Sequence, residues 1–166
     1  APEQPASTQQ TTNPPPQEKA YAVLAKKTHD VNAIYEYNAD HPQPLASITK
    51  LMTAAVARER LPADAARANR IKRMMVRSDN AAAEELAESL PAGAFINSMN
   101  EKAAALSMRN TSFFDATGLS YLNQSTAYDI DLLVRHILER HPEIFQWSRE
   151  RELIIDGVVY DTINRF

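Results

Sequence analysis

Features that several functional classes require are missing from this sequence of 166 residues. It contains no cysteine, which excludes disulfide bonds and thiolate metal sites. No apolar run reaches the length of about 20 residues that a membrane-spanning helix needs. The three glycines, at positions 93, 118 and 157, form neither a phosphate-binding glycine-rich loop nor a Gly-x-Ser-x-Gly elbow. Nucleotide chemistry is therefore not expected.

An excess of positive charge is also absent. The formal net charge is −3 at pH 7, which argues against a dedicated nucleic-acid-binding protein. The histidines are not spaced like metal ligands, for example as His-Glu-x-x-His, so we expect surface histidines, no metal site and no cofactor. The four histidines are His29, His41, His136 and His141.

The first 19 residues have almost no large apolar side chains and are rich in Pro, Gln and Thr. Such a segment cannot bury enough apolar surface to fold, so we expect residues 1–19 to be disordered. It is typical of the mature end of an exported protein after removal of a signal peptide, and equally of an ordinary disordered terminus. Residues 20–166 are long enough and apolar enough to form one domain.

The hydrophobic periodicity of this domain predicts strands at both ends and helices between them. Helices are expected at about Ser47–Arg60, at 65–76, in a segment that ends at Pro91, at Gly93–Met108, in a segment that begins at Ser125, and at Pro142–Trp147. Strands are expected at Tyr21–Ala25, at Ala33–Tyr37, and in the hairpin Leu153–Ile155 and Val158–Tyr160, and Thr111–Phe114 is expected to be short and extended. This order predicts an α/β or α+β domain, with a mixed sheet and a helical cluster beside it.

The stretch from Pro44 to Ala54 carries the strongest candidate for chemistry. Its apolar residues follow the spacing of a half-buried helix, and Ser47 and Lys50 are three residues apart, so both lie on one face. A hydroxyl beside a lysine that is held among apolar side chains is a candidate nucleophile and base. On spacing alone, this pattern more often reflects a serine at a helix N-terminus and a lysine that faces solvent than a catalytic pair.

Two Ser-x-Asn triplets, Ser78–Asn80 and Ser98–Asn100, could supply further polar groups. The second triplet falls inside a predicted helix, where we expect both polar side chains to face solvent. The first falls at a junction between two helices, where a serine and an amide can project together into a cleft. We therefore select Ser78 and Asn80, although Ser78 is also suited to capping the next helix.

In combination these segments are far more specific than each is alone. They resemble the low-molecular-mass penicillin-binding proteins, which are serine D-alanyl-D-alanine peptidases of the bacterial cell wall, and look closest to the DD-endopeptidase branch. The resemblance runs from about Ala20 to Phe166 and rests on residues 45–54, 78–82, 110–119 and 125–129. It implies a penicillin-binding-protein or β-lactamase-like transpeptidase fold.

The resemblance also implies a role for each candidate residue. Ser47 would attack the carbonyl of a D-Ala-D-Ala or D-Ala-diaminopimelate bond of peptidoglycan and form an acyl-enzyme, which water then hydrolyses. Lys50 would accept the serine proton, Ser78 would relay a proton to the leaving amine, and Asn80 would hold Lys50 or a substrate amide. The Ser47 N–H would be half of the oxyanion hole. β-Lactams would be covalent inhibitors, and the protein would act in the periplasm or elsewhere outside the cytoplasm.

The sequence departs from this family in two places. The third family motif, Lys-Thr-Gly or Lys-Ser-Gly on a central strand, is absent, because none of the three glycines follows such a pair. The link between Lys50 and Ser78 is also shorter than the family usually has. We therefore expect a domain that is incomplete at its C-terminus, or completed by a second segment or chain, or one that has lost catalysis.

Two other functions stay open. A catalytically inactive, wall-associated binding or scaffold protein on the same fold would not need the third motif. A class A β-lactamase shares the Ser-Asp-Asn triplet, but it needs a Glu-x-x-Leu-Asn loop to activate the deacylating water, and the sequence has no such loop.

Overall fold

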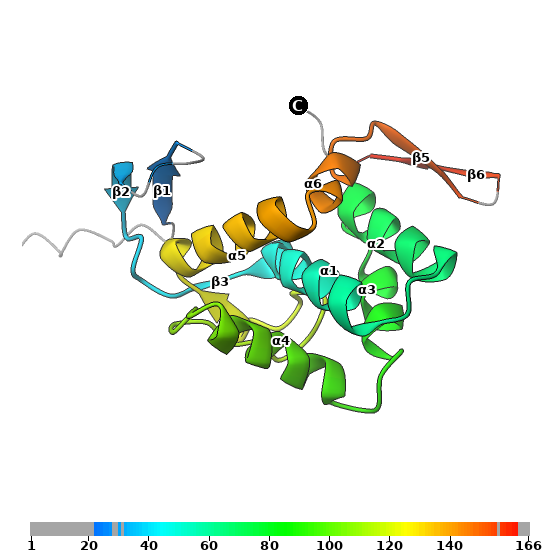
Figure 1. The fold of residues 1–166 in the computed structure, drawn as a ribbon, viewed down its shortest axis with the longest axis horizontal. Coiled ribbons are helices and arrows are strands. Elements are labelled where there is room, and N and C mark those ends of the chain that lie inside the picture. Colours follow the sequence, from blue (N-terminus) through cyan, green and yellow to red (C-terminus); the bar gives the residue numbers. More distant parts are fainter. Residues whose placement is uncertain (1–21, 28–29, 31, 156, 163–166) are drawn as a thin grey trace, which may run out of the picture.

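The computed structural model describes residues 22–27, 30, 32–155 and 157–162, and Figure 1 shows it as a ribbon. The segment expected to be disordered lies outside these residues, so that expectation and the domain boundary at residue 20 remain predictions. Among the described helices, none is both long enough and apolar enough to cross a membrane.

Helices form the body of the described chain (Figure 1). The helices are the 3₁₀ turn η1 (Ala46–Ile48), α1 (Thr49–Arg60), α2 (Ala65–Arg77), α3 (Asn80–Ala87), α4 (Ala94–Ala105), α5 (Ala127–Arg140) and α6 (Glu143–Trp147). The strands are β1 (Val23–Lys26), β2 (Ala33–Tyr37), β3 (Gln43–Pro44), β4 (Gln124–Ser125), β5 (Glu152–Ile155) and β6 (Val158–Asp161). The pairs β1–β2 and β5–β6 lie at the two ends of the described chain, and β3 lies among the helices near the start of α1 (Figure 1). All six predicted helices are confirmed, with ends that differ by a few residues.

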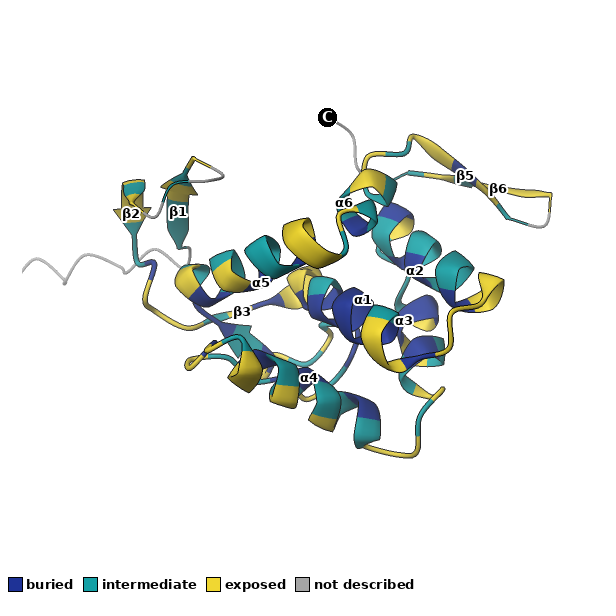
Figure 2. Cartoon of the chain, viewed as in Figure 1, coloured by how far each residue is buried: buried dark blue, intermediate teal, exposed yellow. Residues whose placement is uncertain are grey.

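Helix α1 is the central element of the helical cluster. It contacts α2, α3, α4 and α5, and all the residues from Met52 to Ala57 are buried, which Figure 2 shows as a nearly continuous dark blue helix. The prediction that this helix is half-buried is therefore wrong, because neighbours pack on it from several sides and its many alanines let them approach closely. The largest fully buried side chains of this core include Phe95, Met52, Ile71, Met74, Leu86, Met99, Leu133 and Ile137.

Polar side chains at the helix starts explain where α2 and α5 begin. Asp64 Oδ1 accepts a hydrogen bond from the N–H of Arg67 at 2.7 Å, and Thr126 Oγ1 accepts one from the N–H of Asp129 at 3.1 Å. Each bond satisfies an N–H of the first turn that has no intrahelical acceptor. The Asp129 carboxylate also accepts a hydrogen bond from the N–H of Asn110 at 2.8 Å, which ties the segment after α4 to the start of α5.

The strands form three separate antiparallel pairs, β1–β2, β3–β4 and β5–β6. Val23 of β1 is opposite Tyr37 of β2, and β5 and β6 form the hairpin that was predicted from the sequence. Helices packed beside small antiparallel sheets confirm the α+β class. The arrangement differs from the single mixed sheet that we expected, because the part of the chain that the structure describes has no strand joining these pairs.

Short pairings bring distant segments together next to the start of α1. Besides the β3–β4 pair, the N–H of Leu45 donates a hydrogen bond to Asn123 O at 2.9 Å. Residues 111–114, which we predicted to be short and extended, form an isolated antiparallel bridge through Ser112 to Gln124. These contacts position the loop between that bridge and β4 against the first turns of α1.

Candidate active site

Ser47 and Lys50 lie on successive turns where η1 leads into α1. Ser47 is exposed, whereas Lys50 is buried, with 3% of its surface exposed. Lys50 Nζ donates a long hydrogen bond of 3.4 Å to Ser47 Oγ. The structure therefore brings the two residues together, as their spacing predicted, with a surface hydroxyl above a buried amine.

Ser78 reaches the same hydroxyl from the junction between α2 and α3. Its backbone is left-handed, with φ 55° and ψ 35°, a conformation that residues with a side chain seldom adopt. From this turn its Oγ donates a hydrogen bond of 2.8 Å to Ser47 Oγ. The Ser47 hydroxyl is thus in contact with an amine from α1 and a hydroxyl from a separate element.

Lys50 is also held by the loop of residues 113–123, which lies between the two bridged residues Ser112 and Gln124. Its Nζ donates a hydrogen bond of 2.6 Å to Thr117 O, which is shorter than its bond to Ser47. Burial lowers the pKa of Lys50 below its usual 10.5, and the negative charges of Asp115 and Asp79 act in the opposite direction. An amine with a lowered pKa next to a hydroxyl is suited to accept a proton from it.

The carboxylate of Asp115 stabilises this loop from within. It accepts hydrogen bonds from the N–H groups of Thr117, Gly118 and Ser120 at 2.7, 2.6 and 2.5 Å. Although burial favours the neutral acid, these bonds outweigh that effect and lower the pKa of Asp115. The loop therefore holds its shape around a fixed negative charge, and this shape positions the carbonyl that Lys50 contacts.

Two threonines of α1 and one buried asparagine attach the loop to the helix. Thr53 Oγ1 donates a hydrogen bond of 2.7 Å to Ala116 O, and Asn123 Nδ2 donates one of 3.1 Å to Thr49 Oγ1. Asn123 is fully buried, and its Oδ1 accepts a hydrogen bond of 2.7 Å from the N–H of Phe114. These three residues were not predicted from the sequence. The available signal was the pair of threonines four residues apart on the helix that carries Lys50.

Gly118 lies directly against the residue that precedes Ser47. Its φ is +88°, and a Cβ added to it would lie 1.8 Å from Ala46 O. Ala46 itself has a φ of 45°. Both the backbone conformation and the lack of space therefore require glycine at this position. The close approach fixes the backbone of η1, and with it the position of the Ser47 hydroxyl.

Asn80, the fourth predicted site residue, is the first residue of α3 and is half-buried. It lies two residues after Ser78, so it belongs to the same junction. Among the described residues, the hydrogen bonds of Lys50 go to Ser47 and Thr117. The structure therefore unites Ser47, Lys50 and Ser78. Of the two roles expected of Asn80, holding Lys50 or holding a substrate amide, the bond to Lys50 is not among those of the described residues.

The rejected triplet, Ser98–Asn100, is oriented differently from our expectation. Asn100 Nδ2 donates a hydrogen bond of 2.8 Å to Phe113 O, and its Oδ1 accepts one of 2.9 Å from the N–H of Phe113. Ser98 is half-buried and donates a hydrogen bond of 3.0 Å to Ala94 O. The prediction that both side chains face solvent is wrong, because the segment after α4 folds back along this face.

Two of the four histidines also contradict the expectation of surface residues. The side chains of His136 and His141 are 17% and 16% exposed, and both face the carboxylate of Glu59. His41 is exposed, with 59% of its side chain accessible, as predicted. His29 lies outside the described residues. The His136–His141 spacing of five residues gave no signal, because the second histidine follows the end of α5 and turns back towards α1.

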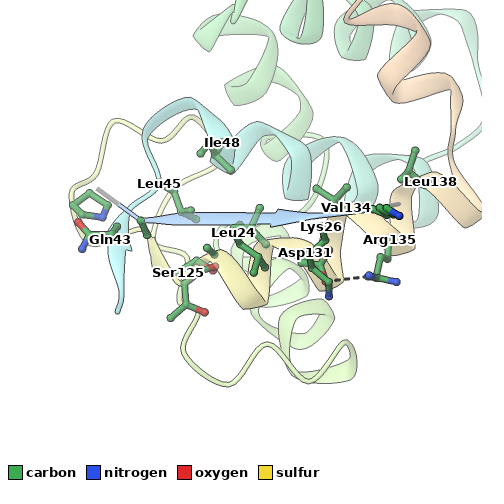
Figure 3. A pocket seen from close by; sticks show the side chains of 16 residues that line it. Leu24, Lys26, Gln43, Leu45, Ile48, Ser125, Asp131, Val134, Arg135 and Leu138 are labelled. Atoms are coloured by element: carbon green, nitrogen blue, oxygen red, sulfur yellow. Dashed lines mark hydrogen bonds and ion pairs between the residues drawn. The ribbon is translucent and has the colours of Figure 1, made fainter. Parts of the chain in front are cut away.

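A cavity of about 780 Å³ lies beside η1, between β1 and α5 (Figure 3). Apolar side chains line much of it, among them Leu24 of β1, Ile48 next to Ser47, and Leu138 of α5. The ion pair between Lys26 Nζ and Asp131 Oδ2, at 2.9 Å, lies across its wall. Ile48 and Leu138 remain 48% and 41% exposed. Part of the apolar surface of this cavity is therefore not covered by the described residues.

The sequence matches the protein family described as D-alanyl-D-alanine carboxypeptidase over residues 61–165. This range contains Ser78 and Asn80, and it begins after Ser47 and Lys50. Curated D-alanyl-D-alanine endopeptidases from Pseudomonas aeruginosa and Escherichia coli are 36% identical over 148 and 147 residues, which is 72% of this chain and 47% of each relative. The chain therefore spans about half the length of the curated relatives it matches.

Solved penicillin-binding proteins have a similar fold. One from Listeria monocytogenes, in its cefotaxime-bound form, has a TM-score of 0.78 at 27% identity, covering 87% of this chain and 72% of that chain. Penicillin-binding protein 6B from Escherichia coli has a TM-score of 0.75 at 22% identity, covering 93% and 61%, a likeness of fold alone. These likenesses confirm the predicted fold.

Proposed function

This chain belongs to the D-alanyl-D-alanine carboxypeptidase family, and from that premise we propose that it acts as a serine DD-peptidase on peptidoglycan. Its substrates are stem or cross-link peptides that contain D-alanine, and its catalytic residues are Ser47, Lys50, Ser78 and Asn80. The observation that carries this proposal is the position of Ser47 Oγ, which is 3.4 Å from Lys50 Nζ and 2.8 Å from Ser78 Oγ.

In the first step, Ser47 Oγ attacks the carbonyl carbon of the peptide bond that follows D-alanine, and its proton passes to neutral Lys50. The lowered pKa of Lys50, which follows from its burial, increases the neutral fraction that can accept this proton. The bond of Lys50 to Thr117 O keeps the amine in place while the serine reacts.

In the second step, the C–N bond breaks and the leaving amine takes up a proton. Ser78 Oγ, already bonded to Ser47 Oγ, passes this proton from Lys50 to the amine. Asn80 holds a substrate amide in this mechanism, and this role does not require a bond to Lys50. Water attacks the ester on Ser47, which releases the shortened peptide and restores the serine.

The turn that carries Ser47 also supplies part of the oxyanion hole. In η1 the N–H of Ile48 donates to Leu45 O at 3.0 Å and the N–H of Thr49 donates to Ala46 O and Ser47 O. The N–H of Ser47 precedes these donors, at the positive end of the turn, where developing negative charge is stabilised. It forms half of the hole, and a second donor comes from elsewhere.

We further propose that a segment outside these 166 residues, or a partner chain, completes the site. A Lys-Thr-Gly strand would carry the second oxyanion donor and the cation that binds the substrate carboxylate, and the sequence has no such motif. The apolar cavity beside η1, with Ile48 half-exposed in its wall, offers a surface on which such a strand can pack (Figure 3). A peptidoglycan substrate places the protein outside the cytoplasm.

The missing motif also supports a second candidate, a wall-associated scaffold protein that keeps the fold but has lost catalysis. The two candidates differ in one measurable property, the reactivity of Ser47 towards an acylating agent. A β-lactam is suited to this test because its strained amide acylates a serine placed as Ser47 is, and the adduct stays on the protein.

The experiment is to incubate the protein with a fluorescent penicillin and to measure the adduct by intact-protein mass spectrometry. We expect a stable adduct that Ser47→Ala abolishes. The matched control is Ser98→Ala, which removes the half-buried serine of the other triplet and should leave the adduct unchanged. The absence of an adduct in a folded sample would overturn the peptidase for this chain, and rapid turnover of the penicillin would indicate a β-lactamase instead.

The pH dependence of the same reaction tests the role of Lys50. If neutral Lys50 is the base, the acylation rate should rise with pH and level off at a value below 10.5, because burial lowers the pKa of this lysine. Lys50→Arg, which keeps the positive charge but does not lose its proton, should abolish the rise. An acylation rate that does not change with pH in the unchanged protein would contradict the role.

A further inference from the structure

Three side chains with metal-binding groups meet at the end of α1 that is remote from Ser47. Glu59 is in the last turn of α1, His136 is in α5, and His141 directly follows α5. Glu59 Oε1 is 2.9 Å from His136 Nε2 and 3.3 Å from His141 Nε2. One ligand atom from each of the three residues lies within 4.8 Å of the other two.

These distances suit a small divalent ion. Zinc binds imidazole nitrogen and carboxylate oxygen at about 2.0–2.2 Å, so two ligands of a tetrahedral site are about 3.4 Å apart. The two spacings from Glu59 Oε1 are already within about 0.5 Å of that value. Two imidazoles with one carboxylate also leave the fourth tetrahedral position open for a water molecule.

The surroundings of the cluster supply part of what a metal site needs. His136 and His141 are half-buried, with 17% and 16% of their side chains exposed, whereas Glu59 is an exposed residue with 25% of its side chain accessible. The other ring nitrogen of His141, Nδ1, is 4.0 Å from the carboxylate oxygen Oε1 of Glu143, and Arg58 is paired with the same oxygen at 2.7 Å. Histidines that bind metals commonly donate their second ring N–H to a carboxylate. Here 4.0 Å is too long for a hydrogen bond, so Glu143 would have to move by about 1 Å to make this contact.

Lys102 of α4 contacts this cluster directly and competes with a metal ion. Its Nζ is 2.6 Å from Glu59 Oε2, 2.7 Å from Glu59 Oε1 and 3.4 Å from His136 Nε2. The ammonium group therefore contacts both oxygens of the carboxylate and one of the two imidazoles, at the position that a metal ion would take. Lys102 orients Glu59, but its charge opposes a divalent ion that lies close to it.

We propose that Glu59, His136 and His141 bind a divalent transition-metal ion, with Zn²⁺ as the natural candidate, and that this ion joins the end of α1 to the end of α5. The site lies nine residues from Lys50 along α1, which is about 14 Å at 1.5 Å per residue. At that distance the ion takes no part in the reaction at Ser47, so its effect is on stability. The proposal does not depend on the peptidase function.

The first test measures binding of Zn²⁺ to the metal-free protein by competition with a chromophoric chelator. We expect one ion per chain, and a rise in Tm of about 5–10 °C when free Zn²⁺ exceeds Kd a hundredfold. Co²⁺ in place of Zn²⁺ should give the intense visible absorption of a tetrahedral site. No binding by the unchanged protein, or the weak spectrum of octahedral Co²⁺, would overturn the proposal.

Variants locate the ion and distinguish it from an ion-pair cluster. His136→Gln and His141→Gln should each weaken Zn²⁺ binding at least tenfold, and the exposed control His41→Gln should leave it unchanged. Lys102→Gln should tighten Zn²⁺ binding, because it removes the competing cation. If Lys102→Gln weakens binding, or if the His136 and His141 variants bind as tightly as His41→Gln, Glu59 serves only as the anion of an ion-pair cluster and the proposal is wrong.

Discussion

Replacing Gly118 by alanine adds a single methyl group at the closest contact in the candidate active site. The new Cβ would lie 1.8 Å from Ala46 O and 2.4 Å from Ala46 C. Both atoms belong to the backbone, so no side-chain rotation can relieve the overlap. Either the loop around Gly118 or the turn that carries Ser47 has to move.

The size of the effect follows from two contributions. A side chain at the left-handed φ of +88° costs about 1–2 kcal/mol. Overpacking of a rigid contact adds typically about 1–3 kcal/mol. We therefore expect Gly118→Ala to lower the free energy of unfolding by about 2–5 kcal/mol, a large fraction of the roughly 5–15 kcal/mol that stabilises a domain.

Gly93 provides a control that separates the two contributions. Its φ is +79°, close to that of Gly118, but a Cβ added there would meet nothing within 4 Å. Gly93→Ala should therefore show the conformational cost of about 1–2 kcal/mol alone. Urea denaturation of both variants, followed by circular dichroism, measures the difference directly. The acylation rate with fluorescent penicillin reports whether Ser47 has moved.

Either of two results would refute the claim that the contact between Gly118 and Ala46 positions Ser47. One is a loss of stability in Gly118→Ala no larger than that in Gly93→Ala. The other is an unchanged acylation rate in Gly118→Ala, because a displaced η1 would separate Ser47 Oγ from Ser78 Oγ.

Three further predictions concern the loop and the two triplets. Asp115→Asn should destabilise the protein by about 1.5–3 kcal/mol at pH 7, because the carboxylate accepts three loop N–H groups. The pKa of Asp115 is lowered in the folded protein. The stability difference between the two proteins should therefore be complete above pH 3.8, the usual pKa of aspartate, and disappear as the pH falls through the folded pKa. Urea titrations at several pH values measure this difference. Asn100→Ala should lose about 1–3 kcal/mol by leaving both backbone groups of Phe113 unpaired. Asn80→Ala should change stability by less than about 0.5 kcal/mol but slow acylation, and equal stability losses in these two variants would contradict the assignment.

The sequence predicted the parts of the structure that depend on local patterns. Apolar spacing gave all six helices, and the two-residue turn gave the β5–β6 hairpin. That Ser47 and Lys50 are neighbours follows from helix geometry, since residues three apart lie on one face, but their choice as a catalytic pair came from the resemblance to the family. Ser78 was selected because a break in helical periodicity between α2 and α3 is visible in the sequence.

What the sequence did not predict depends on contacts between distant segments. Asn123 is 74 residues from Thr49 along the chain, and nothing near it indicates that its amide will be buried. The burial of α1 on several sides, and of His136 and His141, depends on how the helices pack rather than on any one helix. Asn100 was placed in solvent because a helical pattern does not show which segment later covers it.

The left-handed backbone at Ser78 sets stability and chemistry against each other at one position. A glycine there would remove a conformational cost of about 1–2 kcal/mol and fit the turn more easily than serine does. It would also remove the hydroxyl that donates to Ser47 Oγ. A search for stabilised variants of this protein should therefore recover Ser78→Gly, and the variants that recover it should be the ones that trade reactivity for heat resistance.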